Sequence, residues 1–352
     1  MVNSEKILYA CNLILSKCLN VFWCFFGGRR RAESVKRIVC IKLDEIGDMA
    51  TAVGVFDQLK LAFPQAKIDV MCKPFVKTMI EFDPNIDRII FDVSELETYD
   101  IWVELRGNWT TLIKSIFKTR KYRVDRGTIR FQQRGNQLHE SLTNSKIIAP
   151  IFRNFFKEKS HYFSQNSPKL YTHQQHRDLA NLRLNEMGIL GKFVVVHPSA
   201  RRKLRQWSSK KFESIAAYLW DKHQIETVLM GTQEELSILE EIKQQHPFIK
   251  KWVSQDSLLV FYEMVLRAEF FLGNESGPLQ IADLTGKPVI GLFGPGVQNV
   301  FYPQQNNRSK VIHNVLDCNP CNQMDCVQDQ PCIELISTFD VTTAIEDVLW
   351  TK

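Results

Sequence analysis

The stretch RIVCIKLDEIGDMATAVGVFDQLKLAFPQAKIDVMCK, residues 37–73, indicates the fold class. Its first seven residues form an apolar run that predicts a β-strand, residues 49–63 carry apolar side chains at helical spacing, and residues 67–73 predict another strand. A strand, a helix and a strand in this order are typical of parallel α/β layers. Further strands are expected at residues 88–93 and 101–105.

A second series of the same kind begins at residue 192. Its expected strands contain FVVVH, ETVLMG, EFFLGN and PVIGLF, and its expected helices contain SSKKFESIAAYLWDKH, QEELSILEEIKQQ and GPLQIADLTG. The basic, irregular residues 120–185 separate the two series, so we expect a segment of residues 1–35, a domain of residues 36–180 and a domain of residues 181–352. Two open parallel sheets would bind ligands at the carboxyl ends of their strands, in a cleft between the domains.

The composition excludes several classes of protein. The chain has 352 residues, of which 44% are hydrophobic, so it can bury a sizeable core and is not mainly disordered. The net charge of +6 is compatible with anionic substrates, membrane phosphates or nucleic acid. No Gly-x-Gly-x-x-Gly follows the first strand, and no Gly-x-x-x-x-Gly-Lys-Ser/Thr occurs in the sequence. These absences argue against dinucleotide-dependent hydride transfer and against P-loop ATP hydrolysis.

An apolar segment, ILYACNLILSKCLNVFWCFFGGRRR, occupies residues 7–31. Asn12, Ser16 and Asn20 recur every four residues and form a polar stripe opposite Leu, Ile, Phe and Trp side chains. The preferred interpretation is an interfacial membrane helix, whose following three arginines meet anionic head groups. A helix packed on the protein's own surface and a true membrane span are the alternatives. No cleavable secretory signal is evident, so the body of the protein is expected in the cytoplasm.

A carboxylate-rich turn, Asp44–Asp48, lies between the first strand and the first helix. Gly47 is expected to let the chain bend tightly, which places Asp48 in or next to the first helical turn. The carboxylate of Asp48 then has two interpretations, an N-cap for its own helix or a general base that takes a proton from an attacking hydroxyl. Asp44 and Glu45 are expected to be solvated or to pair within the turn.

Two loops of the second half are candidate anion sites. Residues 198–207, PSARRKLRQW, carry four cations and precede a helix, so their amides and side chains suit a diphosphate. A solvated basic loop is the alternative. Residues 275–278 open another helix, where Ser276 can donate to phosphate and Glu275 can accept hydroxyl groups of a ribose or sugar. A plain capping turn is the alternative there.

These blocks resemble the lipopolysaccharide heptosyltransferase family, glycosyltransferase family 9, over most of residues 36–350. IKLDEIGDMATAVGVFDQLKLAFPQAKIDVM is similar to the family's opening strand, turn and helix, and VVVHPSARRKLRQWSSKKFESIA to its donor-phosphate segment. LGNESGPLQIADLTGKPVIGLFGP is similar to its Asp-Ser/Thr-Gly-Pro-x-His-x-Ala block, and CNPCNQMDCVQDQPCIELIS to its cysteine-bearing tail. The resemblance implies a GT-B type α/β fold of two Rossmann-like domains with parallel sheets, in which the C-terminal domain binds the donor and the N-terminal domain binds the acceptor.

The resemblance also implies an activity. It points to an inverting, metal-independent glycosyltransferase without a cofactor, which moves a sugar from a nucleotide diphosphate donor, ADP-heptose first, to lipopolysaccharide core or a similar glycan or lipid-linked acceptor. Asp48 matches the catalytic base. The residues that match the donor site are Ser199, Arg205, Glu275, Ser276, Gly277 and Gln280. Glu275 and Gln280 stand where the family usually has Asp and His, which leaves the donor sugar open.

The basic stretch between Arg106 and Arg134 would then face an acceptor that carries phosphates, with Arg106, Arg126 and Arg130 as the expected acceptor-binding residues. An ordinary charged surface is the alternative. The protein is expected at the cytoplasmic face of the inner membrane as a peripheral protein, with no nucleic-acid partner.

Three alternatives stay open at this point. A non-catalytic nucleotide-sugar or glycan-binding protein would keep the fold and lack turnover, and a nucleic-acid-binding protein would use the basic middle segment. The third concerns the tail, where four cysteines either ligate zinc or remain thiols that pack the tail. These cysteines are Cys318, Cys321, Cys326 and Cys332.

Overall fold

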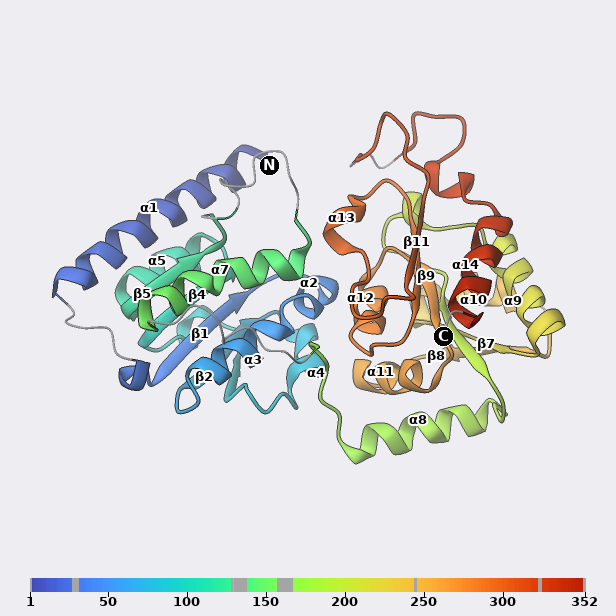
Figure 1. Cartoon of the computed structure of the whole chain (residues 1–352), viewed down its shortest axis with the longest axis horizontal. Helices are drawn as coiled ribbons and strands as arrows, with labels where there is room; N and C mark the ends of the chain where they lie inside the picture. Colours follow the sequence, from blue (N-terminus) through green and yellow to red (C-terminus); the bar gives the residue numbers. More distant parts are fainter. Residues whose placement is uncertain are drawn as a thin grey trace. The chain divides into compact units, whose positions relative to one another are not determined.

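The computed structural model of the chain describes residues 2–26, 32–127, 129, 138–156, 167–243, 246–321 and 325–350. It divides into two compact units, Met1–Tyr171 and Thr172–Lys352, each built on a parallel sheet (Figure 1). This confirms the predicted α/β class. The boundary expected after residue 180 lies inside helix α8 (Gln174–Glu186), which belongs to the second unit.

The first unit contains a five-stranded parallel sheet in the order β3-β2-β1-β4-β5. Its strands are β1 Arg37–Lys42, β2 Lys67–Cys72, β3 Arg88–Ile90, β4 Tyr99–Arg106 and β5 Thr119–Asp125. Its helices are α1 Val2–Phe26, α2 Ile46–Ala50, α3 Val53–Ala62, α4 Lys77–Ile80, α5 Trp109–Lys118 and α7 Glu140–Phe155. Cys40 of β1 lies in register between Val70 and Val103 of its neighbours, and all three are fully buried. Continuous apolar runs are what a parallel sheet covered on both faces requires.

The helix expected over residues 49–63 is interrupted. Helix α2 ends at its C-cap Thr51, and α3 starts at Val53. The hydroxyl of Thr51 donates to the carbonyl of Asp48 over 2.7 Å, a local bond that competes with continuation of the helix. The tight bend expected at Gly47 is also wrong, because Gly47 is the second residue of α2 and is not among the described glycines with positive φ.

The second unit contains a six-stranded parallel sheet in the order β11-β10-β9-β6-β7-β8. Its strands are β6 Phe193–His197, β7 Glu226–Gly231, β8 Ile249–Val253, β9 Phe271–Asn274, β10 Val289–Phe293 and β11 Lys310–His313. Its helices are α8, α9 Ser209–His223, α10 Leu236–Lys243, α11 Leu258–Arg267, α12 Gly277–Asp283, α13 Gln298–Phe301 and α14 Thr338–Trp350. One core joins the sheet to α9 and α14, with Leu229, Phe212 and Ile345 among its fully buried members.

Helix α1 packs on the edge strand β5 and contacts α5 (Figure 1). Its polar stripe faces the protein: Asn12 and Ser16 are each 4% exposed, and Asn20 donates to the carbonyl and accepts from the amide of Arg123 over 2.7 and 2.9 Å. The alternative of a helix packed on the protein's own surface therefore holds. The polar face of α1 points toward the protein, and the interfacial membrane interpretation of its apolar face stays a prediction. Among the helices of the described residues, none combines the length and the apolar character that a membrane crossing needs.

The expectation that the basic stretch forms a surface is wrong at Arg123, because this residue is fully buried. Its guanidinium lies 3.6 Å from Glu104 and 3.5 Å from Asp125, and it donates to Ser115 over 2.9 Å and to the side chains of Asn12 and Ser16. Arg123 therefore joins α1 and α5 to the sheet and is not available to an acceptor.

Candidate active site

In each unit the predicted site residues lie where the strand order reverses. The first sheet extends from β1 toward β2 in one direction and toward β4 in the other, and the second sheet does the same from β6 and β9. Loops that leave such a pair of strands diverge, and ligands of open parallel sheets bind there, outside the carboxyl ends of the strands. Asp48 follows β1, Arg205 follows β6, and Glu275 follows β9.

A buried charged cluster lies at the end of β1. Lys42 has a fully buried side chain, 2.9 Å from a carboxylate oxygen of Asp44 and 3.4 Å from one of Glu140. Arg126 donates to both oxygens of Glu140 over 2.6 and 2.7 Å. Burial alone would raise the pKa of Glu140, but the hydrogen bonds and charges of Arg126 and Lys42 lower that pKa to about 2. Glu140 is therefore ionised across the neutral pH range.

Two of the three predicted acceptor residues, Arg106 and Arg126, belong to this cluster. Arg106, at the end of β4, lies 3.3 Å from the second oxygen of Asp44 and donates to the hydroxyl of Tyr9 on α1. Arg126 is committed to Glu140, and Arg130 lies outside the described residues. Asp44 pairs with two cations, Lys42 nearby in the chain and Arg106 at the end of β4, so the expectation that it is solvated is wrong. The acceptor role of the arginines stays a prediction.

Asp48 is the third residue of α2 and is half-buried. The N-cap of α2 is Glu45, so Asp48 does not cap its own helix. Its carboxylate forms no hydrogen bond and no ion pair with any residue that the structure describes. Burial raises the pKa of Asp48; the negative charges of Asp44 and Glu140 act in the same direction, while Lys42 and Arg126 oppose them.

A carboxylate with raised proton affinity and no partner in the described chain has the properties of a general base. The base role of Asp48 stays a prediction.

In the second unit, the half-buried Arg205 and the buried Glu275 form an ion pair, with 3.3 Å between Nη1 and Oε1. The Arg205 Nε atom, the Glu275 Oε2 atom and the Ser276 hydroxyl are buried and have no hydrogen-bond partner among the described residues. Burial raises the pKa of Glu275, while the charges of Arg205 and Arg202 lower it. Because buried polar atoms are nearly always hydrogen-bonded, these three atoms mark the place where ligand hydroxyls or phosphate oxygens would find partners.

Gly296 makes room for this carboxylate. A Cβ atom at Gly296 would lie 2.0 Å from Oε2 and 2.4 Å from Oε1 of Glu275. A side chain at Gly296 would therefore displace the Glu275 carboxylate from its place beside Arg205.

Asn274 and Ser199 organise the basic loop after β6. The Asn274 side chain donates to the carbonyl of Pro198 over 2.6 Å and accepts from the amide of Trp207 over 3.2 Å, which fastens both ends of the loop to β9. Ser199 is buried, and Glu235 has an acceptor role toward it. Burial would raise the pKa of Glu235, but hydrogen bonds from His197 and Ser199 contribute to lowering that pKa to about 2. The donor role of Ser199 stays a prediction.

The remaining predicted donor residues lie on α12. Ser276 is its N-cap but makes no side-chain cap hydrogen bond, so the plain capping alternative does not use its hydroxyl. Gly277 and Pro278 form its first residues. Gln280 is buried and donates to the carbonyl of Phe301 over 2.6 Å, which anchors α13. The structure thus gives Gln280 a structural partner, and its donor role stays a prediction.

Four residues of these sites were missed from the sequence. Lys42 gave one signal, a lone cation at the end of the apolar run RIVCIK. Glu140 gave none, because it meets Lys42 across 98 residues of chain. Asn274 and Gly296 act through contacts of loops that only the folded sheet brings together.

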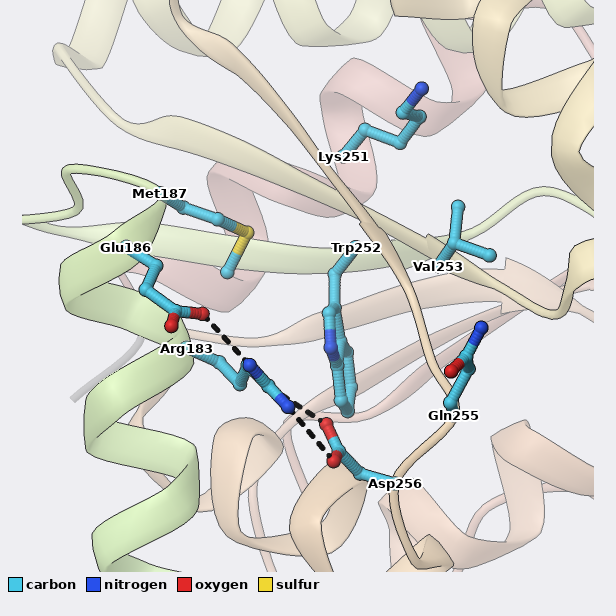
Figure 2. Close-up of a pocket in the computed structure, with 8 residues that line it drawn as sticks. All are labelled: Arg183, Glu186, Met187, Lys251, Trp252, Val253, Gln255 and Asp256. Carbon is cyan, nitrogen blue, oxygen red and sulfur yellow. Dashed lines mark hydrogen bonds and ion pairs between the residues drawn. The ribbon is translucent and has the colours of Figure 1, made fainter.

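A cavity of about 290 Å³ lies elsewhere in the second unit, between α8 and β8 (Figure 2). Arg183 of α8 points into it and pairs with Asp256 over 2.9 Å and with Glu186 over 2.9 Å. Trp252 and Met187 supply its apolar wall. None of the predicted site residues lines this cavity, and the Arg183 guanidinium is already paired with two of its carboxylates.

The tail cysteines are free thiols, with Cys332 buried and Cys318, Cys321 and Cys326 half-buried. Burial raises the pKa of the Cys332 thiol, and the neighbouring Cys321 and Cys318 contribute in the same direction. No group of three or more His, Cys, Asp or Glu side chains is placed to hold a metal ion within the described residues, which do not include residues 322–324.

Comparison with known proteins identifies the family. Residues 115–331, more than half of the chain, match the family model of glycosyltransferase family 9 (heptosyltransferase). The chain belongs to glycosyltransferase family 9. This confirms the resemblance drawn from the sequence motifs.

Individual members are similar to this family 9 chain over much of its length. Lipooligosaccharide heptosyltransferase 2 of Campylobacter jejuni subsp. jejuni is 26% identical over 208 residues, which are 53% of this chain and 66% of that protein, just under two thirds of its length. The solved structure of a family 9 glycosyl transferase from Veillonella parvula covers 89% of this chain and 97% of its own, with a TM-score of 0.73 and 18% identity. The structure of E. coli ADP-heptose lps heptosyltransferase II covers 89% and 98%, with a TM-score of 0.67 and 16% identity. These two structures confirm the predicted GT-B type of fold.

Proposed function

We propose that this family 9 chain is an inverting glycosyltransferase that moves a sugar from a nucleotide diphosphate donor to a lipopolysaccharide core or a similar surface glycan. The observation that carries the proposal is that each unit has its own candidate site at a strand-order reversal. One holds Asp48, a carboxylate of raised pKa, and the other holds the Arg205–Glu275 pair with its unpartnered buried polar atoms. Membership of glycosyltransferase family 9 supports a sugar-transfer role for the chain.

In the proposed reaction Asp48 accepts the proton of an acceptor hydroxyl as the hydroxyl oxygen bonds to the anomeric carbon of the donor sugar. The bond from that carbon to the phosphate oxygen breaks, and its electron pair leaves with the nucleoside diphosphate. Attack on the face opposite the leaving group inverts the anomeric configuration. Negative charge grows on the leaving phosphate, and Arg205 with the other cations of residues 201–205 would stabilise it. This assignment needs no metal ion, in keeping with the absence of an Asp-x-Asp motif from the sequence.

For the donor we propose ADP-heptose. The E. coli neighbour is described as an ADP-heptose enzyme, and the basic loop offers cations for a diphosphate. Glu275 would accept hydroxyl groups of the sugar or ribose, because it is buried beside Arg205 with one oxygen unpartnered. Ser199, Ser276, Gly277 and Gln280 would line the same donor site.

For the acceptor we propose a phosphate-bearing lipid-linked glycan, contacted by Arg106, Arg126 and Arg130. An acceptor carried on a lipid places the reaction at a membrane, so we propose that the protein works as a peripheral protein at the cytoplasmic face of the inner membrane. Nucleic acid has no role in this proposal.

Two measurements test the proposed function. A panel of nucleotide sugars should raise the melting temperature of the protein, with ADP-heptose giving the largest shift, because a ligand that binds only the folded form stabilises it. The Asp48→Asn variant should keep this shift and lose sugar transfer by at least about a hundredfold. Donor binding without any turnover by the unaltered protein would instead favour the non-catalytic sugar-binding alternative.

A further inference from the structure

Helix α1 turns its polar face toward the protein and its apolar face outward, the reverse of a helix on the surface of a water-soluble protein. Its inward face is polar, with Asn12 and Ser16 buried against Arg123. Its outward face is apolar, with Ile14 63% and Phe22 54% exposed. The other exposed apolar side chains on this face are Ile7 and Val21. Water-exposed helices normally show the opposite arrangement, with the apolar stripe facing the core.

Helix α5 repeats this reversal beside α1. Thr111 and Ser115 point inward, where they donate to Glu104 and accept from Arg123, respectively. The outward face carries Trp109, Ile113, Ile116 and Phe117, which are between 41% and 76% exposed. The spacing 109, 113, 116, 117 places these four side chains on one side of the helix. Figure 1 shows α5 alongside α1 on the same side of the first unit, and the two helices are in contact.

The reversal has a structural cause. Glu104, Arg123 and Asp125 form a buried charged group in β4 and β5, each at most 2% exposed. Buried charges need hydrogen-bond partners, which the polar faces of α1 and α5 supply. Both helices are therefore held with their apolar sides outward by the interior of the unit itself.

The charge of the two outward faces has one sign. Residues 6–22 and 109–120 contain no Asp or Glu, and their charged residues are Lys6, Lys17, Lys114, Lys118 and Arg120. Asp92 lies near Lys114 at the margin of this surface, but the charged residues of the two segments themselves are all cations. Exposed apolar side chains with cations beside them complement the acyl and anionic head-group layers of a bilayer. The same charges would repel a second copy of this surface, which argues against a dimer through it.

We propose that the outward faces of α1 and α5 together form the surface by which the protein binds an anionic lipid bilayer, with both helices lying in the plane of the membrane. This inference deepens the proposed membrane location and rests on it for the biological setting. It replaces the single interfacial helix expected from the sequence by a two-helix surface attached through Arg123. The apolar side chains enter the head-group and acyl boundary, and the lysines meet lipid phosphates.

Flotation with lipid vesicles tests the proposal without any sugar donor. The full chain should bind vesicles of phosphatidylcholine mixed with phosphatidylglycerol, and the Ile14→Ser/Phe117→Ser variant should bind them at least about tenfold more weakly. A Lys17→Glu/Lys118→Glu variant should bind these vesicles about tenfold more weakly than the unaltered protein, and its binding to vesicles of phosphatidylcholine alone should change little. The matched control is Leu190→Ser/Phe339→Ser in the second unit, whose side chains are 94% and 76% exposed and whose loss should leave binding unchanged.

Three results would overturn the proposal. They are no vesicle binding by the unaltered protein, equal loss of binding in the control variant, and self-association of the unaltered protein that the Ile14→Ser/Phe117→Ser change abolishes. Sugar transfer to a soluble acceptor should be equal in all four proteins. Failure of transfer throughout, with vesicle binding intact, would count against the proposed function and not against this surface.

Discussion

Arg123 connects three elements of the first unit, and its replacement by methionine tests how strongly it does so. The methionine keeps much of the apolar volume and removes the charge and the five donors of the guanidinium. Glu104 and Asp125 would remain buried, having lost a cation at 3.6 and 3.5 Å. Asn12, Ser16 and Ser115 would each lose a hydrogen-bond partner as well.

The expected loss follows from the buried carboxylates. Removing one partner of a buried ion pair costs about 3–5 kcal/mol, because the remaining charge stays desolvated. Glu104 keeps its bonds from Trp102 and Thr111, which favours the lower part of this range. We therefore expect the free energy of unfolding of the first unit to fall by about 3 kcal/mol. Helix α1 should open first, because its polar face would lose its principal partner.

Hydrogen exchange read by mass spectrometry measures this loss unit by unit, since two units need not unfold together. Amides of α1 and β5 should exchange faster by a factor that corresponds to the lost free energy, and those of β6 and β9 should not change. Arg183→Met is the matched control, because Arg183 also pairs with two carboxylates but has a 32% exposed side chain, so its loss should cost below about 1 kcal/mol. A loss in Arg123→Met no larger than in this control would refute the reasoning.

Three further predictions concern the two candidate sites. The pKa of Asp48 is raised, so kcat/KM should fall on acidification at a pH above the ordinary pKa range of an aspartate. Arg126→Gln should shift this fall to still higher pH, because it removes a cation that lowers the pKa of Asp48. An unchanged pH profile would count against Asp48 as the base. Gly296→Ala should weaken donor binding about tenfold or more in calorimetry, because the new Cβ atom displaces the Glu275 carboxylate, and unchanged binding would place the donor elsewhere. The pKa of Glu140 is lowered from 4.5 to about 2 in the folded state. Its ionised form therefore adds about 3 kcal/mol to the free energy of unfolding, which is complete above pH 4.5 and is lost as the pH falls toward 2. Urea unfolding across this range should therefore show a shallower pH dependence for Glu140→Gln, and equal slopes would contradict the assigned pairing.

The central strands were predictable from the sequence because both faces of a parallel sheet are covered there, whereas the edge strands β5, β8 and β11, which carry charged or half-buried residues, were not expected. That burial demands unbroken apolar runs such as FVVVH in β6, which stand out from their surroundings. The positions of the candidate residues were predictable for the same reason, since Glu275 follows β9 directly and Asp48 lies in the turn and helix after β1. Their roles stay predictions. Local side-chain hydrogen bonds were harder to predict from the sequence, as the helix interruption at Thr51 shows.

The direction of the α1 polar stripe was not predictable from periodicity. Asn12, Ser16 and Asn20 fix which residues share a face, but whether that face meets water or protein depends on Arg123, more than a hundred residues away. Only the folded sheet buries that cation and turns the stripe toward it. Lys42 and Glu140 illustrate the same limit, because a charge that looks solvated in sequence can be neutralised by a distant partner.

The side chain of Asn20 has a consequence for shortened forms of the protein. Its side-chain amide donates one hydrogen bond to the backbone of β5 and accepts one from it, as a neighbouring strand would. It therefore caps part of the open edge of the sheet. A chain trimmed to start at β1 would offer that edge, together with an exposed cation, to the sheets of other molecules. Recombinant versions that omit the first helix would then precipitate, even though every catalytic candidate was still present.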